Sequence, residues 1–218
     1  MLISVTVKAF PSAAFATASV QVVSSIEDSD AFWNVLTNML SRFPALNDQG
    51  VAGYNNIASN ITLPEFNIMT PINGLSGIFF LPLVHPSNTT ESFAASINDF
   101  VAQTTAGYPQ VVSSVNFTTY PNFFAYYQNG NGPLDGGTDV MLGSRLLDGK
   151  ALTGNSTALK QAIQLATPPG QVTQANLVGG RNVWNAKPRG GSNAVNSAWR
   201  RAYVHASMLM ASSLKELD

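Results

Sequence analysis

Apolar and polar residues follow two different periods along this chain, so both strands and helices are expected. A period of two, rich in β-branched residues, is typical of strands, and a period of about 3.6 is typical of amphipathic helices. The first pattern predicts strands at residues 2–8, 17–25, 50–58, 66–70, 76–84, 110–119, 138–147 and 171–178, and from Tyr203 onward. The second predicts helices from Asp30 to Pro44, from Thr90 to Gly107, over 156–166 and, in short form, within 120–129.

The order of these elements indicates the fold class. Three strands follow one another over 50–84 without a helix between them, and Ile72-Asn73-Gly74 has turn chemistry. A meander of this kind argues against a doubly wound parallel sheet. We therefore expect an α+β fold, with a large antiparallel sheet covered by helices on one face. The acidic residues Glu27, Asp28 and Asp30 are interpreted as cap and dipole partners of the first helix.

Composition limits the number of domains and the kinds of partner to be expected. The chain has 218 residues, of which 45% are hydrophobic and only 11% are charged, and its net charge is −1. This suits one domain, or one large domain with a short appendage, and it gives no field that would attract nucleic acid. No apolar run approaches the roughly 20 residues that span a bilayer, so no membrane segment is expected.

Charge is unevenly distributed between the two parts of the chain. Residues 1–148 carry three basic and ten acidic side chains, whereas residues 149–215 carry eight basic ones and no acid. One interpretation is a basic surface that meets a phosphate group or an acidic partner domain. The other is a single globule whose two parts neutralise each other.

The compartment is suggested by glycosylation signals rather than by cysteine. The chain has no Cys, which excludes disulfides, zinc–thiolate sites and Cys nucleophiles. Four sequons begin at Asn60, Asn88, Asn116 and Asn155, although about three would arise by chance on this composition. We expect a secreted glycoprotein. Residues 1–8 alternate like a strand rather than a signal peptide, which favours a fragment of a longer protein.

The chemistry-bearing residues match no common catalytic signature. A nucleophile elbow, a zinc motif, a P-loop and a dinucleotide-binding glycine motif are all missing. His85 is interpreted as a surface-turn residue and His205 as a packed core or sheet-face residue. The run Gly179-Gly180-Arg181 resembles an anion-binding loop, although no helix start clearly follows it.

Two further observations bear on catalysis. The aromatic residues of 120–127 would either line a pocket or pack in the core. No Asp or Glu lies between Asp148 and Glu216, so this region can supply no carboxylate base. A general base from it would have to be a Tyr or a His, or the base lies elsewhere.

Six short motifs, in order, resemble the berberine-bridge-enzyme-like FAD-linked oxidases of fungi. They cover residues 1 to about 207 and are Ser4–Pro11, Asp30–Trp33, Tyr120–Phe124, Gly143–Leu147, Gln174–Gly180 and Ala194–Arg200. The resemblance implies that residues 1–12 end the flavin-binding domain and that 13–218 form a substrate-binding domain, incomplete at its C-terminus. It implies oxidation of an alcohol, sugar or related CH–OH or CH–N substrate, with hydride transfer to FAD.

The resemblance also implies where the cofactor and the small-molecule substrate bind. FAD would be held mainly by the flavin-binding domain that precedes this segment in the family, and that domain would be this chain's partner. Residues Gln174 and Asn176 on the family's central strand, together with Arg145 and Tyr54, are the predicted substrate contacts. The alternatives are that Gln174 and Asn176 only mark the polar face of a half-buried strand, and that Arg145 pairs with Asp139 or Asp148.

Two other functions remain open at the level of the sequence. The chain would be a truncated, non-catalytic binding module without flavin, or a secreted carbohydrate-binding domain that uses its exposed aromatic residues. The visible spectrum of the protein distinguishes a flavoprotein from both.

Overall fold

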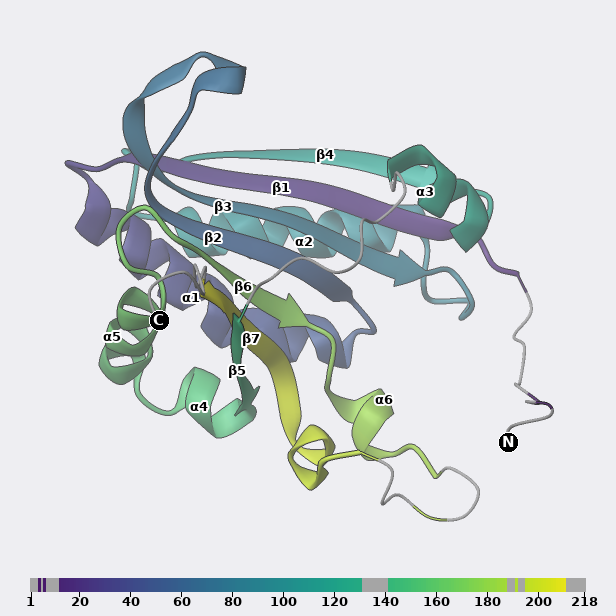
Figure 1. Ribbon diagram of the computed structural model, residues 1–218. Coiled ribbons are helices and arrows are strands. Elements are labelled where there is room, and N and C mark those ends of the chain that lie inside the picture. The colour runs from purple at the N-terminus through teal and green to yellow at the C-terminus, as the bar shows by residue number, and fades with distance from the viewer. Residues whose placement is uncertain are drawn as a thin grey trace.

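The computed structural model describes residues 12–130, 141–187, 191 and 195–210, together with Ser4 and Thr6 (Figure 1). Its strands are β1 (Phe15–Ser25), β2 (Ala52–Leu63), β3 (Ile68–Pro82), β4 (Val112–Tyr120), β5 (Met141–Asp148), β6 (Val172–Leu177) and β7 (Ala202–Met210). Its α-helices are α1 (Ser29–Asp48), α2 (Thr90–Thr105), α3 (Phe123–Gly130), α4 (Gly149–Thr153), α5 (Ser156–Ala166) and α6 (Arg181–Trp184). Short 3₁₀ turns are η1 (Pro64–Phe66) and η2 (Ser197–Arg200).

The seven strands form one antiparallel sheet in the order β4-β1-β3-β2-β6-β7-β5. Strands β4 and β5 are its edges. The helices α1, α2, α4 and α5 pack on one side of the sheet (Figure 1). The α+β class predicted from the sequence, with a large antiparallel sheet and helices on one face, is confirmed.

The core lies between the sheet and these helices. Each core strand sends every second side chain toward the helices, as the two-residue period requires. Fully buried members of this layer include Val20, Ile57, Phe79 and Leu177 from the sheet and Phe43 from α1. Ring contacts join Phe43 to Phe79 at 5.8 Å, so the longest helix is anchored over the middle of the sheet.

Helix α1 differs from its prediction at both ends. It does not end at Pro44 but contains it and runs on to Asp48, because Phe43 and Leu46 are both buried in the core. Burial on both sides of the proline outweighs the lost backbone hydrogen bond. At the other end Asp28 occupies the cap position, but its side chain makes no cap hydrogen bond and accepts one from the Ser25 hydroxyl at 3.1 Å instead.

The predicted three-strand meander is two long strands. The turn falls at Pro64–Phe66, where Asn67 takes a left-handed φ of 58°, and Ile72-Asn73-Gly74 lies inside β3. The physical reason is Asn73, whose buried side-chain oxygen accepts the backbone N–H of Asn60 at 3.1 Å. The pairing of β2 with β3 is irregular between Ala58 and Ile61, and this hydrogen bond gives the Asn60 N–H a partner there. A residue typical of turns is therefore needed within the strand.

The remaining elements agree with the sequence in part. Strands β1, β4, β6 and β7 and helices α2, α3 and α5 lie where they were predicted. The start of the strand predicted at 138–147 and nearly all of the one at 2–8 lie outside the described residues. Most of the segment 1–12 assigned to the flavin-binding domain also lies outside them, so that domain boundary stays a prediction. Helices α4 and α6 were missed, because at five and four residues they are too short to show a period; α6 begins at Arg181, directly after the glycines where no helix start was expected.

Candidate functional site: the open face of the sheet

The side of the sheet opposite the four core helices, here called the open face, carries a row of polar side chains. The register aligns one polar residue from every strand: Ser114, Gln21, Ser76, Asn56, Gln174, Ser207 and Ser144, in the order of the sheet. Within this row the Gln21 amide donates to the Ser76 hydroxyl at 2.9 Å, and the Ser207 hydroxyl donates to the Gln174 side-chain oxygen at 3.2 Å.

A second row on the open face contains two of the predicted substrate contacts. Because Gly53 pairs with Leu177 and Asn56 with Gln174, the register places Tyr54 opposite Asn176. Asn176 in turn pairs with His205 on β7. The side-chain oxygen of Asn176 accepts the backbone N–H of Asn55 at 3.2 Å, which fixes the orientation of its amide.

The fold therefore brings together three of the four predicted residues: Tyr54, Gln174 and Asn176. Tyr54 is exposed, and the other two are half-buried. Neither of the two rows contains Asp, Glu, Lys or Arg. The open face consequently presents amides, hydroxyls, a phenol and an imidazole, which suits a neutral ligand that both donates and accepts hydrogen bonds.

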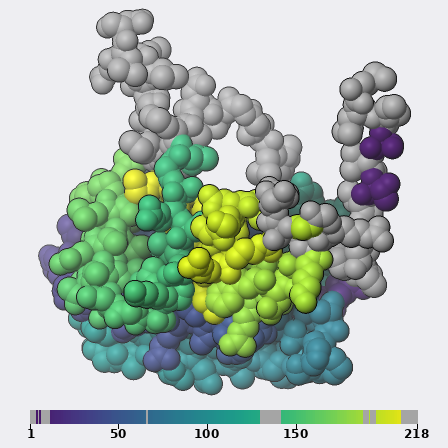
Figure 2. All heavy atoms as spheres, turned by 90° about the horizontal axis from the view of Figure 1, so that it is seen from below, coloured from purple at the N-terminus to yellow at the C-terminus, as the bar shows by residue number. Residues whose placement is uncertain are grey.

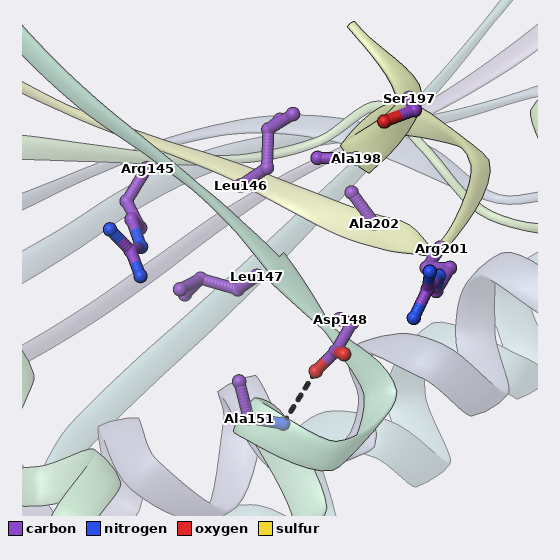
Figure 3. Close-up of a pocket in the computed structure, with 9 residues that line it drawn as sticks. All are labelled: Arg145, Leu146, Leu147, Asp148, Ala151, Ser197, Ala198, Arg201 and Ala202. Atoms are coloured by element: carbon purple, nitrogen blue, oxygen red, sulfur yellow. Dashed lines mark hydrogen bonds between the residues drawn. The ribbon is translucent and has the colours of Figure 1, made fainter.

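Arg145 does not join this group. It pairs with Ala206 on β7, which lies between the two polar rows, so Arg145 faces the opposite side of the sheet. Its side chain leaves β5 on the same side as Leu147 and away from Leu146 (Figure 3). An open hollow of about 410 Å³ lies at this edge between β5, α4 and η2 (Figure 3). Its lining includes Arg145, Asp148 and Arg201.

The predicted ion pair of Arg145 is also not present within the described residues. The Asp148 carboxylate instead caps α4 by accepting the backbone N–H of Ala151 at 2.8 Å. Asp139, the other predicted partner, lies outside the described residues. The role of Arg145 as a substrate contact stays a prediction, and the structure gives it no neighbours among the other three candidates.

Aromatic side chains occupy one margin of the open face, where α3 lies. Phe15 of β1 is their centre, with ring centroids of Phe80, Phe123 and Tyr126 within 5.3–5.7 Å. Tyr54 continues the group through Phe80 at 5.8 Å. The aromatic run of 120–127 thus packs on the open face rather than in the core, and it connects α3 to a predicted substrate contact.

The phenol of Tyr126 is affected by this packing. Burial raises the pKa of Tyr126 above its ordinary value, and the neighbouring hydroxyls of Tyr54 and Tyr120 raise the pKa further. Tyr126 therefore stays protonated at neutral pH and can donate a hydrogen bond but cannot serve as a base.

The loop Gly179-Gly180-Arg181 does not fit the pyrophosphate of FAD. The backbone N–H groups of both glycines are taken by β7, donating to Tyr203 at 3.0 Å and to Ala202 at 2.7 Å. A Cβ on Gly179 would collide with the Ala202 carbonyl, so the glycine allows the backbones to approach closely. Arg181 pairs with Asp48 at 3.1 Å. The two glycine N–H groups and the Arg181 Nε are thus used to hold the chain together.

The uneven charge distribution is balanced across the fold. The two ion pairs formed by the described residues both join the acidic first part to the basic second part: Lys160 with Asp30 and Arg181 with Asp48. This favours the interpretation of one globule whose parts neutralise each other. In the described residues no helix is long and apolar enough to cross a membrane, and no cluster of side chains could hold a metal ion.

Sequence analysis found part of the polar surface and missed the rest. The alternation of Gln174 and Asn176 marked one strand, and Tyr54 was chosen from its place in the predicted meander, without Asn56. Gln21, Ser76 and Ser207 were missed, because only pairing between strands far apart in the sequence shows that they share one row.

Known proteins with a similar sequence or fold are flavoproteins. No protein-family model matches this chain. A curated protein, an uncharacterized FAD-linked oxidoreductase of Arthroderma benhamiae, is 28% identical over 205 residues, which are 93% of this chain and 34% of that protein.

Solved structures show the same fold. The VAO-type flavoprotein MtVAO713 from Myceliophthora thermophila C1 superposes with a TM-score of 0.76 at 20% identity, over 93% of this chain and 35% of that one. GilR, an oxidoreductase of gilvocarcin biosynthesis solved with pregilvocarcin, superposes with a TM-score of 0.59 at 12% identity, over 95% of this chain and 39% of that one. The chain is thus similar in sequence to an FAD-linked oxidoreductase, has the fold of part of a VAO-type flavoprotein, and spans about a third of the length of these relatives.

Proposed function

We propose that this chain is the substrate-binding portion of an FAD-dependent oxidoreductase and that the open face is the surface that contacts the substrate. The observation that carries the proposal is the polar row that crosses all seven strands. Two neighbouring pairs of the row are hydrogen-bonded, Gln21 with Ser76 and Ser207 with Gln174, so part of this surface is ordered before a ligand binds. The similarity to an FAD-linked oxidoreductase supplies the chemistry that this surface would serve.

The flavin belongs to the part of the protein outside this chain. The chain spans about a third of its relatives, and the N–H groups of Gly179 and Gly180 are occupied by β7. When bound, FAD accepts a hydride from an alcohol, sugar or related CH–OH or CH–N substrate. The task of this chain is to bind and orient that substrate against the flavin-binding domain, its partner in the complete protein.

Three residues carry the substrate contact in this proposal. The Gln174 and Asn176 amides and the Tyr54 hydroxyl face the same side and lie on the neighbouring strands β6 and β2. Asn176 uses its oxygen for the Asn55 backbone, so its amide N–H₂ is oriented for an acceptor on the substrate. Directional contacts of this kind fix which carbon of a polyfunctional substrate is presented for oxidation.

A berberine-bridge-like subfamily and a secreted location are the finer parts of the proposal. Six motifs support the subfamily. Exposure of three of the four sequon asparagines, Asn60, Asn116 and Asn155, supports secretion, because a glycan needs an exposed attachment point.

The test is the visible absorption spectrum of two samples: the complete gene product that contains this sequence, and the 218-residue chain by itself. Both are incubated with FAD and then desalted. The proposal expects flavin bands in the complete protein and none in the isolated chain. A complete protein without flavin would overturn the proposal and favour a non-catalytic binding module. Flavin retained by the isolated chain would contradict the assignment of the cofactor to the other domain.

A further inference from the structure

A hollow at the β7 margin of the open face lies beside the proposed substrate contacts. It has a volume of about 490 Å³, within the range of small-molecule sites. Its lining comes from β5, from the segment around η2 and from β7, and it includes Ser144, Leu146, Asn196, Trp199 and His205. The surfaces of β5, η2 and α6 gather side by side at this end of the molecule (Figure 2).

His205 links this hollow to the polar rows. Its cross-strand partner on β6 is Asn176, and its partner on β5 is Leu146. Directly paired side chains of adjacent strands have Cβ atoms about 4.5–5.5 Å apart. Trp199 lies against the imidazole with ring centroids 5.6 Å apart, so the ring is held between an indole and an amide at the rim of the hollow.

His205 also stands apart chemically on this surface. The two polar rows hold no carboxylate and no ammonium group, and imidazole is the one side chain there that ordinarily changes charge between pH 5 and 8. Tyr126, the half-buried phenol near Tyr54, has a raised pKa, so it stays protonated at neutral pH and cannot accept the proton. An alcohol oxidation needs a group that takes the hydroxyl proton, and this face offers His205.

We propose that His205 is the proton acceptor of the reaction proposed above, and that the hollow beside it holds the hydroxyl-bearing carbon of the substrate. The O–H bond breaks and its proton passes to a ring nitrogen of His205. The electron pair left on oxygen forms the C=O bond. The hydrogen on carbon leaves with its electron pair to the flavin, so the alcohol is oxidised by two electrons and the flavin is reduced by two. This inference rests on the proposed function.

The groups that face His205 permit this role. Asn176 from β6, Leu146 and Ser144 from β5 and Trp199 from η2 are all uncharged. Arg145 is the charged residue in the lining of the hollow, and its side chain leaves β5 on the side of Leu147, away from Leu146, the cross-strand partner of His205. On η2, the guanidinium of Arg200 is turned to the carbonyl of Val183, to which it donates at 2.8 Å.

The chain's two histidines provide a matched experiment. The complete flavoprotein is mixed anaerobically with the best donor from a panel of glycerol, D-glucose and benzyl alcohol, and flavin bleaching is followed from pH 5 to 9. His205→Gln and His205→Asn are expected to slow bleaching by about 10²–10⁴-fold and to abolish the fall of the rate on the acid side. His85→Gln is the control, because its ring contacts Ser87 in an exposed turn.

A second readout needs no turnover. In the 218-residue chain the imidazole NMR signals of His205, but not of His85, should shift when the same donor is added. The inference is overturned if bleaching in the His205 variants keeps the rate and pH profile of the wild type, or if the donor shifts both histidines equally. Either result would leave the proposed function intact, whereas a complete protein without flavin would remove both.

Discussion

The two faces of the sheet are built from alternate residues of the same strands and differ in almost every property. Toward the helices, Ile57, Phe79 and Leu177 are fully buried. One position away, Asn56, Ile78 and Asn176 are half-buried or exposed and belong to the open face. Because a strand turns neighbouring side chains to opposite sides, stability and binding are separated within single strands. Substitutions at adjacent positions should therefore have very different effects.

The largest expected effect is on the helix side. Phe79→Ala removes a ring that is 0% exposed and contacts Phe43 and Phe100, and it should lower the free energy of unfolding by about 3–5 kcal/mol. Asn56→Ala, on the open face of the paired strand, should change it by no more than about 0.5 kcal/mol. Urea denaturation of both variants measures the contrast. Similar losses would mean that the open face is also part of the core.

The next effect tests the glycine loop. Gly179→Ala pushes a methyl group into the Ala202 carbonyl and should cost about 1–3 kcal/mol. Gly143→Ala is the control, because an added Cβ there meets nothing within 4 Å. The difference in stability between the two variants is measured by their melting temperatures. A stable Gly179→Ala protein would reopen the interpretation of this loop as a phosphate site.

A smaller effect is expected within the polar row. Ser207 is 8% exposed and donates to Gln174, so Ser207→Ala should cost about 0.5–1.5 kcal/mol. Ser144→Ala, at the exposed end of the same row, should be close to neutral. Equal effects in urea denaturation would show that the hydrogen bonds of the row do not hold it in place.

The smallest effect concerns an exposed ion pair on the helix side. The hydrogen bond and charge of Lys160 hold the pKa of Asp30 below its ordinary value of 3.8. Since the folded pKa is lowered, the pair stabilises the protein above pH 3.8, and this contribution is lost as the pH falls through the folded pKa. Lys160→Met should raise the pKa of Asp30, which carboxyl NMR titration measures. An unchanged pKa would contradict the pairing.

The local pattern of the sequence predicted most elements but not how they meet. The periods of two and 3.6 are local properties, so the strands at β1 and β6 and the helix at α5 could be predicted directly. Pro44 and Asn73 misled because their usual roles are overridden by tertiary contacts, namely the burial of Phe43 and Leu46 and the hydrogen bond to Asn60. Propensity is a weaker influence than burial at such positions.

The residues of the candidate site could also be predicted only in part from the local sequence pattern. Gln174 and Asn176 are two residues apart, so their shared face follows from the strand period alone. Tyr54 joins them through the register of β2 with β6, whose paired residues are about 120 positions apart in the sequence. Arg145 points to the other side because of the register of β5 with β7, whose paired residues are about 60 positions apart. His205 was assigned to the core or a sheet face, and only its pairing with Asn176 reveals its position beside the polar rows.

The most direct test of the open face as the substrate surface is a comparison of two glutamines in the complete flavoprotein. Gln174 lies in the polar row, and Gln161 is exposed on α5 in the helix layer. Anaerobic flavin bleaching is measured against donor concentration for Gln174→Ala and Gln161→Ala. We predict that Gln174→Ala needs about tenfold more donor to reach half its maximal rate, equivalent to about 1.4 kcal/mol of lost binding, and that Gln161→Ala matches the wild type. Equal behaviour of the two variants would contradict the assignment of the open face to the substrate.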